Sequence, residues 1–247
     1  MIKLIRASRP AFLSDSKVLE LTGVYKEESL SVWNKEQIKT PLLASSDGKC
    51  AYCECLLTSE SNYMEVEHFE DKKHNPDKVV EWENLLPSCK KCNGTKSTHD
   101  VIKEPIVNPY IDDPKEHLYM RSYRFRGKTI KGNNTIEVTD LNHSKRLVLS
   151  RFEIGEKIDD LLDTSWDRYI VFTEKKDTRS RNRLISIVEG LLEECQPKAG
   201  YAASTATNLL NDSKFIDLVL AMKGQNIWTK ELNELMNVSS TLVLDCA

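Results

Sequence analysis

The chain has 247 residues, of which 40% are hydrophobic and 30% are charged, and its formal net charge is −3. These values predict a packed core in one large domain or two small ones, and no apolar run is long enough to cross a bilayer. A slightly acidic chain is not a generally basic nucleic-acid binder, so any contact with nucleic acid must use a local basic surface. No secretory signal pattern is visible, and we expect a cytoplasmic protein with reduced thiols.

Residues 1–45 carry no chemical motif and are expected to form a helical and extended N-terminal arm. A weak helical pattern covers residues 11–22, and a second short helix is expected over residues 35–43. Pro41 is unfavourable inside that second helix, because it lacks a backbone N–H donor. We expect the arm to pack on the following segment or on a partner.

Two C-x-x-C pairs mark the next segment, residues 46–100. Cys50 and Cys53 form the first pair, and Cys89 and Cys92 form the second. A two-residue spacer aims both sulfurs of a pair at one point, so the four thiolates can bind one tetrahedral Zn²⁺ ion. The insert between the pairs is longer than in a short zinc ribbon, which predicts additional structure between them.

Other interpretations of these cysteines are weaker. Cysteines that serve only as small buried residues would seldom repeat C-x-x-C around a polar insert. A thioredoxin-like redox site contains one C-x-x-C motif, whereas this chain has two. Disulfides are disfavoured in a reducing compartment. Cys55 breaks the matched geometry of the two pairs and is not expected to be a ligand, while Cys195 and Cys246 are isolated and read as packing residues or free thiols.

The local pattern predicts β-loop-β-α between and after the cysteine pairs. Residues 63–69 alternate as a strand should, and residues 77–82 suggest one helical turn. A second strand is expected at Leu85 and Leu86 and should end at Pro87. A helix is expected over residues 92–98.

Residues 101–143 are predicted to be an extended segment followed by a β-hairpin. Prolines keep residues 104–110 from forming a helix. The hairpin is expected to pair residues 117–128 with residues 135–138 through a turn at 132–134. Its basic side chains are candidate phosphate contacts, and an ordinary sheet with a charged face is the equally weighted alternative. These candidate nucleic-acid contacts are Arg121, Arg124, Arg126 and Lys128.

Residues 144–247 are predicted to be helical, since apolar residues recur at helical spacing over 147–162, 184–192 and 215–222. The basic run 175–183 is expected to be a solvated face, with a second DNA contact as the less favoured reading. The chain has no P-loop or other Gly-rich phosphate loop, so we see no means for it to hydrolyse ATP by itself.

The segment around the cysteine pairs resembles the HNH endonuclease family. His68, Asn84 and Asn93 fall on the three motif positions, with Asn93 in place of the final histidine, and Glu67 precedes the motif histidine. The resemblance implies an α+β fold, in which structural zinc staples a ββα-metal module inside a mainly helical chain. It also implies that His68 is the general base, that Glu67 and Asn93 hold a catalytic Mg²⁺ or Mn²⁺, and that Asn84 orients the loop near His68. An imidazole base and oxygen ligands suit such phosphodiester hydrolysis.

A narrower resemblance is to the HNH subunit of Septu anti-phage systems, which also occurs with some retrons. The motifs that carry it lie at residues 50–54, 66–69, 82–89, 92–96, 105–109 and 112–118. It implies a DNA substrate and a partner, an ABC/SMC-type (PtuA-like) ATPase that controls access. Two alternatives stay open: a zinc-stapled DNA-binding or adaptor module without turnover, and a stand-alone restriction-type nuclease.

Overall fold

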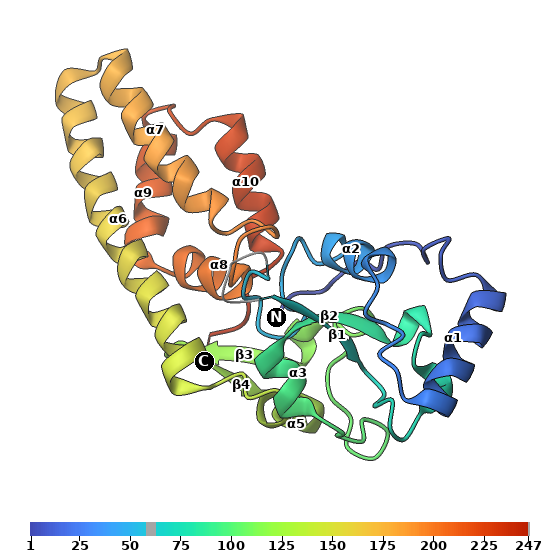
Figure 1. Cartoon of the computed structure of the whole chain (residues 1–247). Helices are drawn as coiled ribbons and strands as arrows, with labels where there is room; N and C mark the ends of the chain where they lie inside the picture. The colour runs from blue at the N-terminus through green and yellow to red at the C-terminus, as the bar shows by residue number, and fades with distance from the viewer. Residues whose placement is uncertain (58–62, 247) are drawn as a thin grey trace. The chain divides into compact units, whose positions relative to one another are not determined.

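The computed structural model describes residues 1–57 and 63–246, and it divides into two compact units. The N-terminal unit comprises Met1–Tyr119 and Phe125–Asn142, and the C-terminal unit comprises Met120–Arg124 and His143–Ala247. Helices dominate, and the described strands form two small sheets, which agrees with the predicted mixture of helix and sheet (Figure 1). No helix of the described residues is long and apolar enough to cross a membrane.

A two-stranded antiparallel sheet lies at the centre of the N-terminal unit. β1 (Met64–His68) pairs with β2 (Leu85–Cys89), so that His68 lies opposite Leu85. The prediction ended the second strand at Pro87, but β2 runs through this proline. The Pro87 carbonyl faces the outer edge, where it accepts a hydrogen bond from Ala51 N at 2.9 Å. Its ring nitrogen faces the same edge, so the missing N–H costs the β1–β2 ladder nothing.

Short helical elements complete the ββα arrangement. The segment between the strands contains two 3₁₀ turns, η1 (Pro76–Lys78) and η2 (Trp82–Asn84), where one helical turn was predicted. α3 (Lys90–Lys96) follows β2 directly and contacts both strands. It begins two residues before the predicted start at Cys92, because the Cys89 sulfur caps it by accepting a hydrogen bond from Cys92 N at 3.4 Å.

The N-terminal arm forms two helices, as predicted, with shifted boundaries. α1 (Asp15–Glu28) begins where the Ser14 hydroxyl caps its first turn. α2 (Glu36–Ala44) contains Pro41 in its interior. Ile38 and Leu42 are completely buried on this helix, and their burial offsets the hydrogen bond that the proline removes.

Arg6 ties the arm to the segment that precedes β2. Its guanidinium donates to the carbonyl oxygens of Trp82 (2.7 Å), Leu85 (2.9 Å) and Glu83 (2.9 Å). The same group stacks 3.8 Å from the centroid of the Tyr110 ring. One side chain therefore satisfies three carbonyls of the turn that carries Asn84.

We expect Arg6→Ala to lower the free energy of unfolding of the N-terminal unit by about 2–4 kcal/mol, since it removes charged hydrogen bonds and a cation–π contact. Urea titration followed by circular dichroism measures this loss. Arg9→Ala is the matched control, because the ion pair that Arg9 makes with Asp15 is exposed and its loss should change stability by less than about 1 kcal/mol. Equal effects of the two substitutions would contradict the role of Arg6.

The hairpin that follows α4 (Pro114–His117) differs from the prediction. β3 (Leu118–Arg121) pairs with β4 (Arg124–Gly127) across a tight turn, in which Ser122 and Tyr123 have φ values of 49° and 62°. The predicted second strand, residues 135–138, is instead part of helix α5 (Ile130–Val138). The glycine read as a turn residue, Gly132, lies inside α5, where a Cβ atom would approach His117 O to 2.0 Å.

The C-terminal unit is a helical bundle around its own core, as the helical spacing predicted. Its helices are α6 (Leu149–Lys175), α7 (Thr178–Glu193), α8 (Ala202–Leu210), α9 (Ser213–Gly224) and α10 (Lys230–Ser240), preceded by a π-helical turn, η3 (Ser144–Val148). α6 and α7 lie side by side as a long helical hairpin (Figure 1). Leu162, Leu184 and Leu218 are completely buried in the shared core, although Phe152 and Leu161 of the predicted apolar face are exposed.

Candidate metal centre and active site

The four cysteines of the two C-x-x-C pairs meet in the N-terminal unit. The sulfur atoms of Cys50, Cys53, Cys89 and Cys92 all lie within 4.8 Å of one another, and all four residues are buried. A zinc ion with Zn–S distances of about 2.3 Å in a tetrahedron requires sulfurs about 3.8 Å apart. The Cys53 and Cys89 sulfurs are 3.8 Å apart, so the cluster fits a metal such as zinc.

The backbone explains how the first pair reaches the second. Glu54 takes a left-handed conformation with φ of 64°, and Cys50 N donates to Cys55 O at 2.9 Å, which closes a tight turn around Cys53. The second pair is placed by the end of β2 and the first turn of α3. Cys55 is buried beside the cluster but is not one of the four mutually close thiols, as expected. None of the seven cysteines, all of which lie in the described part of the chain, forms a disulfide.

His68 ends β1 and has a defined tautomer. Its Nε2 lies 2.8 Å from Val79 O, and because a carbonyl oxygen can only accept, Nε2 must carry the proton. Nδ1 therefore holds the lone pair. Among the described residues no hydrogen-bond partner of Nδ1 is found, so this nitrogen is the one that can accept a proton from water.

The surroundings keep His68 neutral. Its side chain is buried, and burial together with the positive charge of Lys72 lowers the pKa of the imidazole to about 3. Trp33, from the loop between α1 and α2, packs against the imidazole in an edge-to-face arrangement with ring centroids 4.8 Å apart. The His68 imidazole is therefore uncharged near neutral pH.

This burial predicts a pH-dependent stability difference. The unfolded histidine takes up a proton below its ordinary pKa of 6.5 while the folded one stays neutral down to about 3, so the wild type loses stability as the pH falls through that range. We expect the free energy of unfolding of the wild type, relative to His68→Gln, to fall by about 2 kcal/mol between pH 7.5 and pH 5. Urea titrations at both pH values measure it, and a constant difference would contradict the neutral buried state.

Glu67 and Lys96 form a buried ion pair across β1 and α3. Lys96 Nζ lies 2.6 Å from Glu67 Oε1, with both side chains almost completely buried, and it also donates to His68 O at 2.8 Å. Burial raises the pKa of Glu67 to about 7 even though Lys96 opposes the shift.

Asn93 lies on the same face of α3 as Lys96, three residues earlier. Its Nδ2 donates to Glu65 Oε2 at 2.7 Å, which leaves the amide oxygen as an acceptor. Glu65 and Glu67 share one face of β1, since alternate strand residues do. Carboxylate and amide oxygens therefore line this side of the β1–α3 contact, and this donor set suits Mg²⁺ or Mn²⁺.

Asn84 fixes the loop that follows His68. Its Oδ1 accepts from Glu70 N at 2.7 Å, and its Nδ2 donates to Glu70 O at 3.0 Å and to Lys78 O at 3.2 Å. Its backbone carbonyl also accepts from Phe69 N at 2.8 Å. The three side-chain bonds are of the side-chain-to-backbone kind expected of Asn84.

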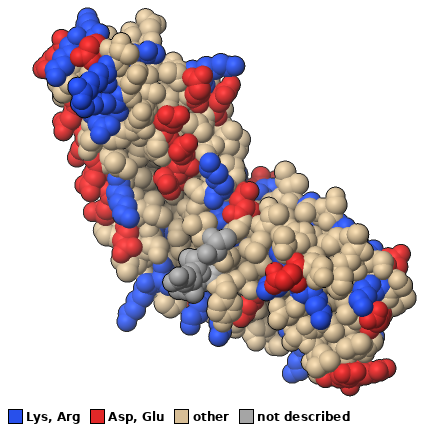
Figure 2. Space-filling view, turned by 45° about the horizontal axis from the view of Figure 1, so that its top comes forward, with Lys and Arg blue, Asp and Glu red and all other residues tan. Residues whose placement is uncertain are grey.

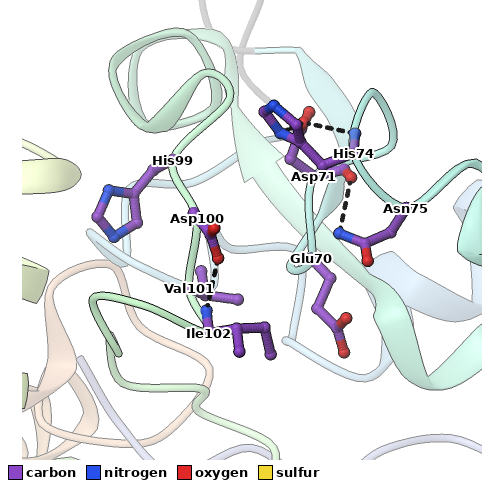
Figure 3. Close-up of a pocket in the computed structure, with 8 residues that line it drawn as sticks. All are labelled: Glu70, Asp71, His74, Asn75, His99, Asp100, Val101 and Ile102. Carbon is purple, nitrogen blue, oxygen red and sulfur yellow. Dashed lines mark hydrogen bonds and ion pairs between the residues drawn. The ribbon is translucent and has the colours of Figure 1, made fainter.

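A hollow of about 170 Å³ lies beside this loop (Figure 3). Its polar side chains do not converge on one point. Asp71 binds the backbone and ring of His74, at 3.2 Å and 2.8 Å, and Asp100 accepts from Ile102 N at 3.1 Å. These groups satisfy one another, so the hollow has no free ligand set.

The predicted nucleic-acid contacts all lie on the β3–β4 hairpin or just after it. Arg121 and Arg126 are exposed, Arg124 is half-buried, and the Lys128 ammonium donates to Lys115 O at 2.6 Å. Figure 2 shows another gathering of Lys and Arg, at the end of the C-terminal unit where α6 meets α7. This is the basic run 175–183, and Arg179 and Arg183 line a hollow of about 560 Å³ there.

Sequence reasoning missed several side chains of the site. Glu65 could have been found because it lies two residues before Glu67 on a strand and so shares its face. Lys96 could have been found because it lies three residues after Asn93 on a helix. Trp33 and Arg6 gave no such signal, because they reach the site from an arm that is distant in sequence.

These features define a protein of mixed helix and sheet with a buried four-cysteine cluster that could hold a metal such as zinc. The chain belongs to the Septu PtuB family. It is 41% identical over 246 residues to the Septu protein PtuB of Bacillus thuringiensis, which covers 99% of this chain and 95% of the relative. It is also 30% identical over 207 residues to the Septu protein PtuB of Bacillus mycoides strain KBAB4, covering 64% of this chain and 68% of that protein. No family model matches the chain.

Proposed function

We propose that this chain is a metal-dependent HNH endonuclease that hydrolyses DNA phosphodiester bonds. In this proposal it is the nuclease effector of a Septu-type anti-phage defence complex, and an ABC/SMC-type ATPase controls it. The observation that carries the proposal is the state of His68. Its Nε2–H donates a hydrogen bond to Val79 O, so its neutral Nδ1 carries a lone pair that can accept a proton. The same unit contains the four-cysteine cluster.

In the proposed reaction, Nδ1 of His68 takes a proton from the attacking water. Asn84 holds the following loop and so keeps the imidazole in position. Glu67 and Asn93 are the residues that would hold a Mg²⁺ or Mn²⁺ ion, with Glu65 beside Asn93. A cation bound there supplies positive charge that stabilises the phosphate and the leaving oxygen.

The low pKa of His68 requires that substrate binding raise it before the imidazole can act as a base. A base with a pKa of about 3 is a poor proton acceptor near pH 7. The negative charge of a bound phosphate raises an imidazole pKa, so His68 becomes an effective base only when substrate is present. This behaviour suits an enzyme that must stay inactive until it is engaged.

Cleavage of plasmid DNA by the full chain tests the proposal. With Mg²⁺ or Mn²⁺, and with the proposed ABC/SMC-type ATPase partner plus ATP, we expect nicked or linear products that a chelator abolishes. A folded, zinc-loaded chain that leaves DNA intact with its partner present would reject the proposal.

The burial of His68 favours one second candidate, a zinc-stapled DNA-binding or adaptor module without turnover. The side chain is only 4% exposed, which a residue with a purely structural role would also show. DNA binding without cleavage under the same conditions would support this module.

A further inference from the structure

A hollow of about 460 Å³ opens beside the proposed catalytic residues in the N-terminal unit. Trp33 and Lys39 line it from the arm, Glu65 and Asn93 line it from β1 and α3, and Lys72 lines it from the loop after His68. Its volume is in the range of about 300–1,000 Å³ that is typical of small-ligand sites. The proposed chemistry uses Asn93 at one side of this hollow, but it gives no role to Trp33, Lys39 or Lys72.

Trp33 joins this hollow to the base. Its ring packs edge-to-face on His68, with 4.8 Å between centroids and 87° between planes. Tyr25 packs on Trp33 in turn, with ring centroids 5.7 Å apart, so the indole is braced from behind. Lys72 Nζ lies 4.9 Å from the Trp33 ring centroid. An aromatic surface and an ammonium group therefore meet next to the imidazole.

The charged and aromatic side chains of the hollow suit a ligand that has both an anionic group and an aromatic ring. Lys39 and Lys72 supply two ammonium groups, while Glu65 supplies one carboxylate, which already accepts from Asn93 Nδ2 at 2.7 Å. Lys39 also pairs with Glu36 at 2.9 Å, but Glu36 is largely exposed and the pair is weak. A nucleotide offers the complementary groups, since its phosphate suits the lysines and its base suits the indole.

We propose that the Trp33 hollow binds one unpaired nucleotide of the substrate strand, next to the phosphate that is attacked by the water His68 deprotonates. Trp33 stacks on the base, and Lys39 and Lys72 contact the backbone. This inference deepens the proposed nuclease function and rests on it. It makes Trp33 a substrate-contacting residue supplied by the arm, and it predicts that single-stranded or locally opened DNA binds better than closed duplex.

Binding to the full chain tests the inference, with Ca²⁺ replacing Mg²⁺ to suppress cleavage. The probes are a labelled single-stranded 12-mer deoxyoligonucleotide, its duplex, and thymidine 3′,5′-bisphosphate as competitor. We expect Trp33→Ala to weaken single-strand binding by about 10-fold or more, and Trp33→Phe to retain most of it. The matched control is Trp228→Ala in the C-terminal unit, where Lys223 also lies over the indole, and it should bind normally.

Two features keep the test decisive. If Trp33→Ala fails to fold, as judged by circular dichroism, Lys39→Gln replaces it, and we expect weaker binding with a smaller salt dependence. Single-strand binding within two-fold of wild type in a folded Trp33→Ala protein, or equal binding of single strand and duplex, would overturn the hollow's role. Trp33-dependent binding in a protein that never cleaves DNA would reject the nuclease and retain the nucleotide site. Normal cleavage by Trp33→Ala would reject the nucleotide site and retain the nuclease.

Discussion

Cys89→Ser should abolish stoichiometric zinc binding and unfold the N-terminal unit. Cys89 supplies one of four mutually close sulfurs, and a serine hydroxyl at this position can still cap α3 but does not replace the thiolate as a zinc ligand, so the substitution removes a metal ligand. Structural zinc contributes an apparent 10–16 kcal/mol in small zinc-binding peptides, which exceeds the stability of many whole domains, about 5–15 kcal/mol. Metal analysis and thermal melting measure both effects.

Two cysteine controls separate a metal effect from a general one. Cys246→Ser changes an exposed thiol of the C-terminal unit and should alter neither zinc content nor melting. Cys55→Ser changes a buried thiol beside the cluster and should keep zinc bound. Full zinc occupancy in Cys89→Ser would contradict the four-cysteine assignment, and loss of zinc in Cys55→Ser would add a fifth thiol to it.

His68→Ala is expected to reduce DNA cleavage by about 10²–10⁴-fold, because general-base catalysis typically contributes that much. Zinc content should be unchanged, since His68 is not one of the four clustered cysteines. The substitution leaves a cavity beside Trp33, so the melting temperature will fall as well. Cleavage must therefore be compared below the melting temperature of the variant.

His74→Ala is the matched control for that loss. His74 lies six residues later, and its side chain is 58% exposed and pairs with Asp71. It should cleave at close to the wild-type rate. Undiminished cleavage by a folded His68→Ala protein would remove His68 from the mechanism, and equal losses in both variants would point to disruption of the shared loop instead.

Much of the central ββα arrangement could be predicted because its signals are local. The alternation around Val66 and the matched C-x-x-C pairs act over a few residues, and the structure has a strand and a cysteine cluster where they indicate. Boundaries were less accurate. α3 starts at Lys90 because a sulfur caps it, and β2 passes Pro87 because that residue faces the sheet's outer edge.

The errors arose where a residue's role depends on distant contacts. Gly132 reads as a turn residue, yet it is a helix residue that lets α5 approach His117 O. The turn of the hairpin is formed by Ser122 and Tyr123, neither of which is a typical residue for positive φ. Trp33 and Lys72 meet His68 only once the arm and the loop have folded, so no sequence window contains all three.

The tip of the β3–β4 hairpin limits how the protein can be divided. Tyr123 belongs to the C-terminal unit, where its ring packs on Phe152 and occupies the space that a side chain at Gly155 would need. The chain therefore passes between the units three times, at 119–120, 124–125 and 142–143. A fragment ending at residue 142 would expose the Tyr123 ring. A fragment beginning at residue 143 would lack that ring and leave the space beside Gly155 unfilled. To express the two units separately, residues 120–124 should therefore be joined to the helical fragment, because dividing the gene at a single position would separate them from it.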